Sequence, residues 1–534
     1  MVRDEGCRGD LRWGSIPGLL RAAAAEHRTR PALVDGAVTL SFEDLLAEAN
    51  ATARAFVGAG IEAGDRVAIW APNIWEWPVT LLGLQSAGAV LVPLNTRYKG
   101  AEAAHILEAS RARILFCVEG FLGNDYVSML RDQLRDSGSE LTHLDRIVVL
   151  RGDPPDGTMD CAEFLALGDG VDQTEVDRRV AELGPDTLSD LLFTSGTTGA
   201  PKGVMCTHGQ AVRAYADWAD VVGLRSDDRY LVINPFFHAF GYKAGIVAAL
   251  TVGATVYPLA VFDVGEVMRA VAEHGITMLP GTPALYHTIL NHPDLDLSSL
   301  ASLRLAVTGA AVVPVELIRQ LRDVLGFENI ITGYGLTEAC GIATMCRHDD
   351  DVETIALTAG RAIPGVEVAV LDEAGAALGP RVAGEVVVRG YNVMRGYFEQ
   401  PDQTAATIDA DGWLHTGDVG FLDERGYLKI TDRMKDMYIV GGFNVYPAEV
   451  ENLLLGHPDV AQVAVIGVPD ERMGEQGRAY VVPRLGSTPD PEEIIAWSRE
   501  HMANYKSPRQ VRIVDSLPTN AAGKVTKFEL RDEG

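Results

Sequence analysis

Short apolar runs alternate with helical patterns along the first 190 residues of the chain. Apolar runs at 66–70 and 91–94 are typical of strands, whereas the region 81–84 has the pattern of a buried helix. Ser41 and Asp44 form a capping-box pattern before another helix, which we expect to end near Gly58 and Gly60. This alternation predicts a layered α/β domain with mainly parallel strands.

The pattern continues after residue 204 and changes texture twice farther along. A helix expected at 211–221 is followed by apolar runs typical of strands at 230–233, 276–279 and 303–307. Between about 360 and 430, alternating strands at 366–371 and 385–389 with Gly- and Ala-rich turns predict a small β-rich subdomain.

A charged cluster at 432–436 precedes a compact α+β pattern. Its predicted elements are strands at 463–466, 480–482 and 511–514 and a helix at 492–502. We therefore expect an N-terminal domain over 1–431, a hinge at 432–436 and a C-terminal domain over 437–534.

Composition narrows the function classes. The 534 residues carry a formal net charge of −28, which argues against a nucleic-acid surface. The six cysteines are scattered without a paired framework, so we expect free thiols in a reducing, cytoplasmic setting. We expect no signal peptide and no transmembrane segment, since the longest apolar region, about 230–259, contains His238, Lys243, glycines and prolines.

Residues 194–203, Thr-Ser-Gly-Thr-Thr-Gly-Ala-Pro-Lys-Gly, have the chemistry of a polyphosphate loop. Glycines let backbone N–H groups converge on an anion, and Lys202 adds a mobile positive charge. The hydroxyl donors are Thr194, Ser195, Thr197 and Thr198, and the first glycine is Gly196. The loop is not a Walker A motif, because it lacks Gly-Lys-Ser/Thr at the required spacing. A flexible linker is the alternative, but the flanking apolar runs favour a turn between buried strands.

Tyr334-Gly335-Leu336-Thr337-Glu338 follows an apolar run and is expected at a strand end, where open α/β sheets bind ligands. Tyr334 offers a face for stacking a base, Gly335 permits close backbone approach, and Thr337 donates a hydroxyl. Glu338 is a hard ligand suited to Mg²⁺. A helix-capping turn is the alternative reading of this segment.

Three further positions and one basic group have weaker signals. Asp418, expected after a tight glycine turn, suits both hydroxyls of a ribose, although an Asx turn explains the same pattern. Lys524, on a Gly-flanked loop, suits charge neutralisation in a transition state, with a solvated tail lysine as the alternative. His238 lies among aromatics as either a core histidine or a residue that gates a pocket. Tyr505, Lys506 and Arg509 form a basic group that suits a phosphate or is simply a surface patch.

In this order the motifs resemble the adenylate-forming superfamily of acyl-CoA synthetases, luciferases and peptide-synthetase adenylation domains, and the resemblance covers nearly the whole chain. Residues 194–203 resemble its phosphate loop, with Phe193 where Tyr is frequent, and 308–311 its adenine-contacting turn. The resemblance implies ATP contacts by Gly309, Ala310, Ala311, Tyr334, Gly335, Thr337, Asp418, Ile430 and Arg433. It implies a Mg²⁺ site at Glu338 and Thr194.

The resemblance also implies two half-reactions on one site. A carboxylate attacks the α-phosphate of ATP with Lys524 bridging the charges, and then the small domain rotates about Lys435 so that the thiol of coenzyme A displaces AMP. His238 joins Lys524 and Lys435 among the implied catalytic residues. The coenzyme A contacts expected from the resemblance and the basic group are Gly441, Gly442, Phe443, Tyr505 and Lys506.

The acid substrate is the least determined feature. The expected acyl contacts are His238, Tyr242, Lys243, Gly309 and Gly335, with Phe236, Phe237 and Phe240 as apolar walls. Lys243 either donates to a distal ketone or carboxylate or extends to the surface. The segments 233–245 and 436–447 resemble bacterial steroid-catabolism CoA ligases, which implies a fused-ring propionate as substrate.

Several alternatives stay open on the sequence alone. The acid is otherwise a medium-chain or aryl acid, and the acceptor is otherwise a carrier protein instead of coenzyme A. A luciferase-type oxygenase and a degenerate nucleotide-binding regulator are further readings, the last disfavoured because Lys202, Glu338 and Lys524 are all present. A homodimer is left open as the assembly.

Overall fold

The computed structural model describes residues 6–194, 201–309, 313–433, 436, 438–440, 443–445, 447–470, 473–502, 504–519 and 525–532. Several predicted site residues lie outside these ranges. They are Ser195, Gly196, Thr197, Thr198, Ala310, Ala311, Lys435, Gly441, Gly442 and Lys524. The side chains of Arg433 and Phe443 are likewise outside the described part of the structure.

The first large sheet is built mainly from the first 207 residues, and its strands number eight in the described part of the chain. All its neighbouring strands are parallel except β9 with β10 and β5 with β6. In spatial order the strands are β10 (Lys202–Thr207), β9 (Leu188–Thr194), β4 (Val90–Pro93), β3 (Arg66–Trp70), β5 (Ala112–Phe121), β7 (Arg146–Arg151) and β8 (Met159–Asp160), with β6 (Asn124–Asp125) beside β5. The helices along this stretch are α3 (Phe42–Gly58), α4 (Glu76–Ser86), α5 (Gly100–Ser110), α6 (Tyr126–Ser137), α7 (Cys161–Ala166) and α8 (Gln173–Glu182).

The second large sheet has nine strands among the described residues and a parallel centre flanked by antiparallel edges. Its order is β17 (Arg361–Ala362), β16 (Thr344–Met345), β15 (Asn329–Tyr334), β14 (Leu305–Gly309), β13 (Met278–Pro280), β11 (Arg229–Val232), β12 (Thr255–Pro258), β1 (Pro31–Asp35) and β2 (Val38–Ser41). The other helices of this part are α1 (Gly9–Trp13), α2 (Ile16–His27), α9 (His208–Val222), α10 (Ala239–Gly241), α11 (Ala248–Val252), α12 (Val264–His274), α13 (Pro283–Leu290), α14 (Val315–Asp323) and α15 (Val352–Leu357).

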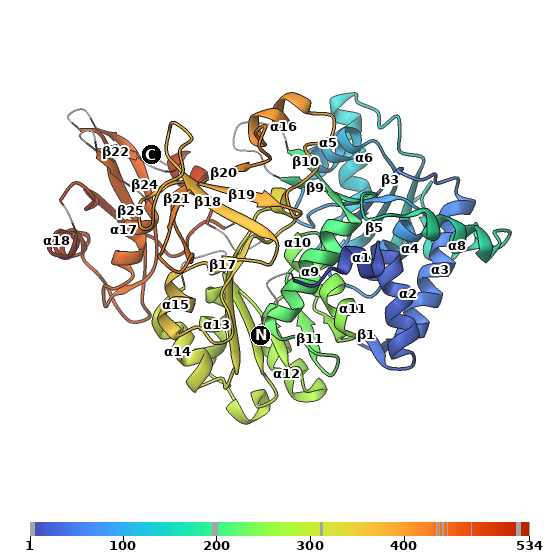
Figure 1. Ribbon diagram of the computed structural model, residues 1–534, viewed down its shortest axis with the longest axis horizontal. Coiled ribbons are helices and arrows are strands. Elements are labelled where there is room, and N and C mark those ends of the chain that lie inside the picture. The colour runs from blue at the N-terminus through green and yellow to red at the C-terminus, as the bar shows by residue number, and fades with distance from the viewer. Residues whose placement is uncertain are drawn as a thin grey trace.

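Two smaller sheets follow, and they lie toward the left of Figure 1. The antiparallel sheet contains β18 (Val366–Leu371), β19 (Gly384–Gly390), β20 (Leu414–Leu422) and β21 (Leu428–Arg433), with α16 (Pro401–Thr407) between β19 and β20. The last sheet contains β22 (Tyr438–Val440), β23 (Phe443–Val445), β24 (Val460–Asp470), β25 (Gly474–Pro483) and β26 (Gln510–Ile513), with α17 (Pro447–Leu454), α18 (Pro491–His501) and α19 (Lys527–Asp532). The predicted hinge at 432–436 falls where one sheet ends and the next begins, and it stays a prediction.

The predicted α/β class, with mainly parallel large sheets and a β-rich subdomain, is confirmed. The capping box at Ser41 and Asp44 is present at the start of α3, and that helix ends at Gly58 as expected. The strand predicted at 276–279 is displaced, because β13 spans Met278–Pro280. In the described residues, no helix combines the length and apolar character needed to cross a membrane.

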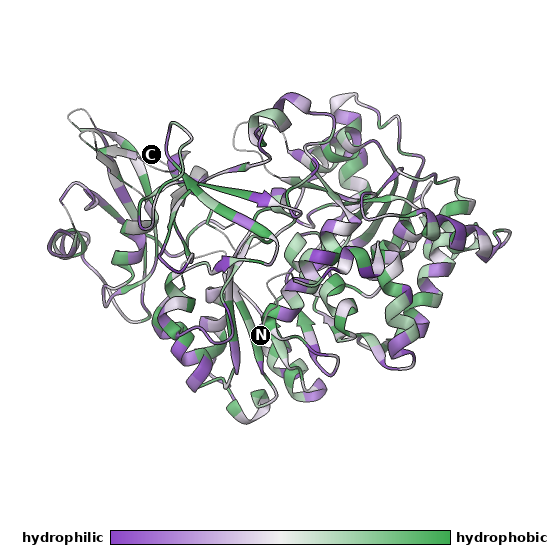
Figure 2. Cartoon of the chain, viewed as in Figure 1, coloured by the Kyte–Doolittle hydropathy of each residue, from purple (hydrophilic) through white to green (hydrophobic). Residues whose placement is uncertain are grey.

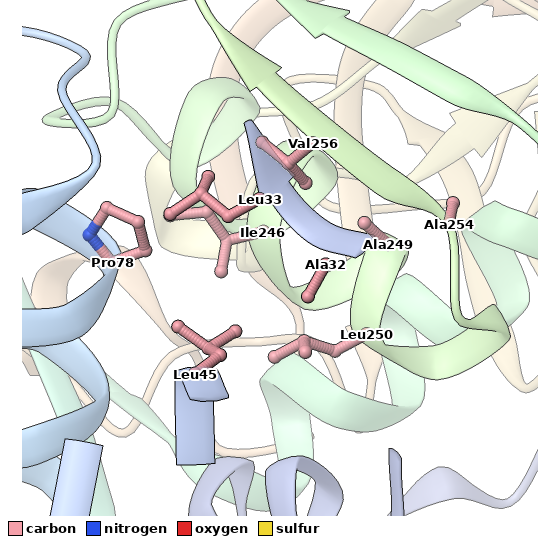
Figure 3. Close-up of a pocket in the computed structure, with 9 residues that line it drawn as sticks. All are labelled: Ala32, Leu33, Leu45, Pro78, Ile246, Ala249, Leu250, Ala254 and Val256. Atoms are coloured by element: carbon pink, nitrogen blue, oxygen red, sulfur yellow. The ribbon is translucent and has the colours of Figure 1, made fainter. Parts of the chain in front are cut away.

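The main hydrophobic core joins the two large sheets. It contains residues from strands of both sheets, such as Ile69 and Leu91 of one and Tyr230 and Ile331 of the other. Figure 2 shows hydrophobic residues concentrated on the strands and inner helix faces, with hydrophilic residues outward on α14 and other outer helices. A small apolar pocket lies within this packing and is lined by Leu33 and Val256 from the paired strands β1 and β12 and by Leu45, among others (Figure 3). Its lining carries no charged group, so we assign it to packing.

A buried histidine ties the N-terminal helices to α9. His208 is the first residue of α9, and its Nδ1 accepts the backbone N–H of Ile16 at 3.4 Å. Complete burial lowers the pKa of His208 to about 3. A positive charge at a helix N-terminus is also unfavourable. The folded protein therefore requires a neutral imidazole at this position.

This requirement predicts acid sensitivity of folding. The free-energy contribution of neutral His208 is fully present above pH 6.5, the ordinary pKa in the unfolded chain, and is lost as pH falls toward 3. The loss reaches about 1.4 kcal/mol per pH unit in that interval. In His208→Asn an amide oxygen replaces the Nδ1 acceptor without titrating. We expect calorimetry to show the wild type losing stability relative to this variant between pH 6.5 and 4.5, and a constant difference would contradict the assignment.

Candidate functional site

The carboxyl ends of several parallel strands meet at one edge of the second large sheet. β11, β13, β14 and β15 are parallel, so their ends at Val232, Pro280, Gly309 and Tyr334 share that edge. Gly309 pairs in register with Gly333, the residue before Tyr334. The segments predicted to hold adenine and the acid thus begin at one edge, as expected for ligand sites in open α/β sheets.

At two positions near this edge the backbone geometry explains why the residue is glycine. Gly309 has φ of +153°, a backbone conformation that other residues rarely adopt. A Cβ at Gly335 would lie 2.2 Å from the carbonyl oxygen of Gly341, which is backbone and cannot turn away. The turn after β15 folds back so closely on itself that only glycine fits at 335.

Asp418 lies in a strand and not after an isolated turn. β20 runs through this position and pairs Asp418 with Arg433 of β21, so the glycine turn expected before Asp418 is a bulge within that strand. The φ of Gly417 is +68°, so the left-handed residue is present but as an irregularity within a strand. Tyr334 donates its hydroxyl to Oδ2 of Asp418 at 2.5 Å.

This contact joins the predicted adenine motif to the predicted ribose carboxylate across two sheets. Ile430, also in β21, pairs with Gly420 and lies two strand residues before Asp432. The structure therefore brings Tyr334, Asp418 and the β21 strand together, whereas their contacts with ATP stay predictions.

Glu338 and Lys202 both contact Tyr397, a residue that sequence reasoning missed. Tyr397 donates its hydroxyl to Oε1 of Glu338 at 2.9 Å. The ammonium nitrogen of Lys202 lies 5.0 Å from the centroid of the Tyr397 ring and donates to Oε1 of Gln403 at 2.7 Å. Burial, followed by the Glu338 charge, raises the pKa of Tyr397, so the phenol keeps its proton.

The carboxylate of Glu338 suits a hard divalent cation. A carboxylate offers about four acceptor directions, and the Tyr397 bond uses one of them at Oε1. Mg²⁺ is usually held by one or two protein carboxylates together with substrate phosphates. Thr337 precedes Glu338 in a short 3₁₀ turn, Thr337–Ala339, and Thr194 ends β9 opposite Lys202.

The chain around Tyr397 is fixed by backbone bonds to both functional segments. The N–H of Met205 donates to Gly396, and the N–H of Phe398 donates to Gly203, at 3.0 and 2.8 Å. Met394 donates its N–H to the carbonyl of Glu338 at 2.8 Å. Residues 394–398 thus fasten the Glu338 turn to β10. The Gly-Tyr pair after an arginine was the only sequence signal, and it is too common to single out.

The segment after β11 presents the predicted acyl residues. Asn73 fixes its path, because its side-chain amide donates to Val232 and Asn234 and accepts the N–H of Phe236. His238 is exposed and caps α10 by accepting the N–H of Phe240 at Nδ1, so the core-histidine alternative is wrong. Surrounding protein, followed by the Lys243 charge, lowers its pKa.

Tyr242 and Lys243 are fully buried. The alternative that Lys243 extends to the surface is wrong, because its ammonium lies 3.0 Å from Oδ1 of Asp190. Tyr242 donates to Oδ2 of the same carboxylate at 3.0 Å. Phe236, also fully buried, packs with Tyr242 against Trp77 and does not form a free wall. The surface available to an acid comes from Phe237, His238 and Phe240, and the acyl roles stay predictions.

The predicted coenzyme A residues are only partly described. The Lys506 ammonium lies 5.8 Å from the ring centroid of Tyr505, and Arg509 bonds to Asn504 beside them. The grouping of all three residues around a phosphate stays a prediction. Phe443 belongs to β23. None of these observations shows a contact with coenzyme A.

Gly335→Ala tests the close approach in the turn after β15. We expect a loss of about 1–3 kcal/mol in stability because the added methyl overlaps backbone. The displaced turn should also weaken the binding of a non-hydrolysable ATP analogue, measured by titration calorimetry. Gly379→Ala is the matched control, since a Cβ there meets nothing within 4 Å. Equal behaviour of the two variants would contradict this account.

Comparison with known proteins agrees with this geometry. The family model described as AMP-binding enzyme matches residues 20–398, and that of the AMP-binding enzyme C-terminal domain matches residues 449–524. A 7a-methyl-1,5-dioxo-octahydro-indenyl propanoyl:CoA ligase of Rhodococcus jostii is 51% identical over 97% of this chain and 98% of its own. A ligase of the same name from Mycobacterium tuberculosis is 49% identical over 98% of this chain and 99% of its own.

Solved structures show the same architecture. The anthranilate CoA ligase AuaEII in complex with anthranoyl-AMP superimposes with a TM-score of 0.87 at 28% identity, covering 98% of this chain and 97% of that one. ATP-bound MatB from Rhodopseudomonas palustris gives 0.84 at 29% identity, covering 97% and 99%. The chain belongs to the AMP-binding enzyme family of the adenylate-forming superfamily and is an AMP-forming acyl-CoA synthetase.

Proposed function

We propose that this ligase activates a steroid-derived fused-ring propionate, an indane-dione propionate, as its coenzyme A thioester. The observation that carries the substrate assignment is identity of about half over nearly the full length of both chains to two ligases named for that acid. The surface of Phe237, His238 and Phe240 supports an acid with a large apolar ring system.

The reaction follows in two half-reactions. A carboxylate oxygen attacks the α-phosphorus of ATP, and pyrophosphate leaves with the electron pair of the broken bond. The thiol sulfur of coenzyme A then attacks the acyl carbon, loses its proton and expels AMP. The first step forms and breaks one bond at the α-phosphorus, and the second forms and breaks one bond at the acyl carbon. The site must therefore accommodate two different leaving groups, pyrophosphate and AMP.

In the first step we assign the triphosphate to Lys202, Thr194 and the loop that follows. Glu338, oriented by Tyr397, would hold Mg²⁺, which supplies charge neutralisation at the phosphates when bound. Asp418 and Arg433 would hold the ribose, and Lys524 would bridge carboxylate and α-phosphate. In the second step, rotation about Lys435 would remove Lys524 and bring residues 441–443, with Tyr505 and Lys506, to the coenzyme A side.

We propose the cytoplasm as the compartment, supported by six cysteines that are all free of disulfides. The homodimer stays a prediction, which sedimentation equilibrium would test.

The substrate assignment predicts the result of a panel assay. AMP release that requires ATP, Mg²⁺ and coenzyme A should have its highest kcat/KM with the indane-dione propionate. Linear medium-chain acids and aryl acids such as anthranilate are the comparison arms, the latter because of the AuaEII likeness. A higher kcat/KM for an aryl or linear acid would replace the fused-ring assignment. Acylation of a carrier protein in the absence of coenzyme A would show that a carrier protein, and not coenzyme A, is the acceptor.

Lys524→Ala should separate the two half-reactions. Loss of the bridging charge is expected to lower pyrophosphate exchange about 100-fold or more, because this group acts at the developing charge. Thioester formation from supplied acyl-adenylate should change by less than about threefold. Lys527→Ala is the control, since that lysine pairs with Glu451 at 2.8 Å and has no proposed contact with substrate. An equal loss in both half-reactions would reject the role of Lys524.

A further inference from the structure

A buried ion pair lies behind the site and is used by none of the steps above. The Lys243 ammonium lies 3.0 Å from Oδ1 of Asp190, and both side chains are completely inaccessible to solvent. Oδ2 of Asp190 accepts hydrogen bonds from Tyr242 at 3.0 Å and from the hydroxyl of Ser189 at 2.6 Å. The carboxylate is therefore held from three directions.

The partners of this pair come from three segments of the site. Asp190 is in β9, four residues before Thr194, at the base of the hairpin that carries Lys202. Lys243 follows His238 by five residues. Its ammonium also lies 3.5 Å from Sγ of Cys340, which follows Glu338 by two residues. We call strands β9 and β10 the phosphate hairpin, and residues 337–340 the Glu338 turn. The ammonium of Lys243 thus contacts both segments.

Local backbone geometry supports this arrangement. Tyr242 and Lys243 are the first residues of a π-helical turn, Tyr242–Val247, and both reach the same carboxylate. A π-helical turn costs regular hydrogen bonding and is frequent at functional sites. Cys340 has φ of +56° and its carbonyl accepts the hydroxyl of Tyr215 at 3.1 Å.

The lysine is charged in this environment. Burial by itself lowers the pKa of Lys243, but Asp190, followed by Cys206, Cys340 and Tyr242, raises it well above the ordinary value. The contact between Cys206 and Cys340 raises the pKa of Cys206 and lowers that of Cys340. The pair is an ammonium beside a carboxylate, surrounded by weakly polar groups.

Stability alone gives little reason for such a pair. Well-packed apolar residues of similar volume often replace a buried ion pair without loss of stability, because desolvation offsets the attraction. What an ion pair adds is a fixed distance and direction between the elements that carry it.

We propose that Lys243 and Asp190 are positioning residues that set the phosphate hairpin and the Glu338 turn at the spacing required to bind the triphosphate of ATP. This inference rests on the proposed function, because it assigns the triphosphate to those two segments. The pair acts on the triphosphate through Lys202 and Glu338 and has no proposed contact with ATP itself.

The test compares single and double neutral variants by melting temperature and by titration with α,β-methylene-ATP and Mg²⁺. Lys243→Met and Asp190→Asn should each melt about 5 °C or more below the wild type, since each leaves a buried charge or its partner unpaired. The double variant should recover most of this loss while binding the analogue about tenfold more weakly than the wild type. Recovery of affinity to within about threefold would overturn the proposal and leave a purely structural pair.

Two further variants keep the test decisive. Tyr242→Phe removes one hydrogen bond from Asp190 and preserves shape, so it should fold and weaken analogue binding about threefold even if the double variant does not fold. Unchanged affinity in Tyr242→Phe, with an unfolded double variant, would overturn the proposal. The control is Arg304→Met with Asp228→Asn, a largely buried pair that precedes β14 and β11 at the opposite strand ends. It should leave analogue affinity unchanged.

Analogue binding requires no acid substrate. A wild type that binds the analogue but activates none of the acids would therefore reject the proposed substrate. The variants would still decide the role of the ion pair.

Discussion

The buried ion pair of Lys243 with Asp190 links the two large sheets, and the proposed placement of the phosphate-binding segments depends on that link. β9 of one sheet carries the carboxylate, while the segment after β11 of the other carries the ammonium. Asn73 adds a second connection, from the end of β3 to the backbone after β11. Lys202 belongs to one sheet and the Tyr334–Glu338 segment lies at a strand end of the other, so the proposed adenylating site requires the two sheets to be correctly placed.

A second set of contacts closes the other side of the site. Residues 394–398 bond to β10 and to the Glu338 turn, and Tyr397 lies between Lys202 and Glu338. Tyr334 then reaches Asp418 of the β-rich sheet. The phosphate hairpin is thus fastened at its base by an ion pair and along its edge by backbone hydrogen bonds.

Sequence reasoning predicted most of the fold because its evidence was local. Strand 66–70, the capping box of α3 and the switch to β-rich texture near 366 depend on neighbours in the chain. The predicted site motifs were found because short runs such as 334–338 carry several functional groups together. Asp190, Asn73 and Tyr397 were missed, since each acts through contacts more than 50 residues away. Gly417 indicated the turn before Asp418, but no sequence signal showed that this turn is a bulge inside β20. For Lys243 the sequence left an acyl contact and an extension to the surface open, because no sequence signal shows a partner 53 residues earlier.

The net charge of −28 means that a polyphosphate must be bound by positive charges and hydrogen-bond donors close to it. At physiological ionic strength, charges farther than about 8 Å through solvent are largely screened, so most of the acidic surface has little effect inside the site. Nearby groups then decide whether a polyphosphate binds. Pairing Asp190 with Lys243 neutralises one carboxylate in this region, while Glu338 accepts only a neutral tyrosine hydroxyl and keeps its charge for a bound cation. Lys202 meanwhile rests against an aromatic face and an amide oxygen, both neutral partners that leave its charge for a phosphate. An acidic protein can therefore bind a highly anionic nucleotide, because the charges next to the phosphates matter more than the net charge of the chain.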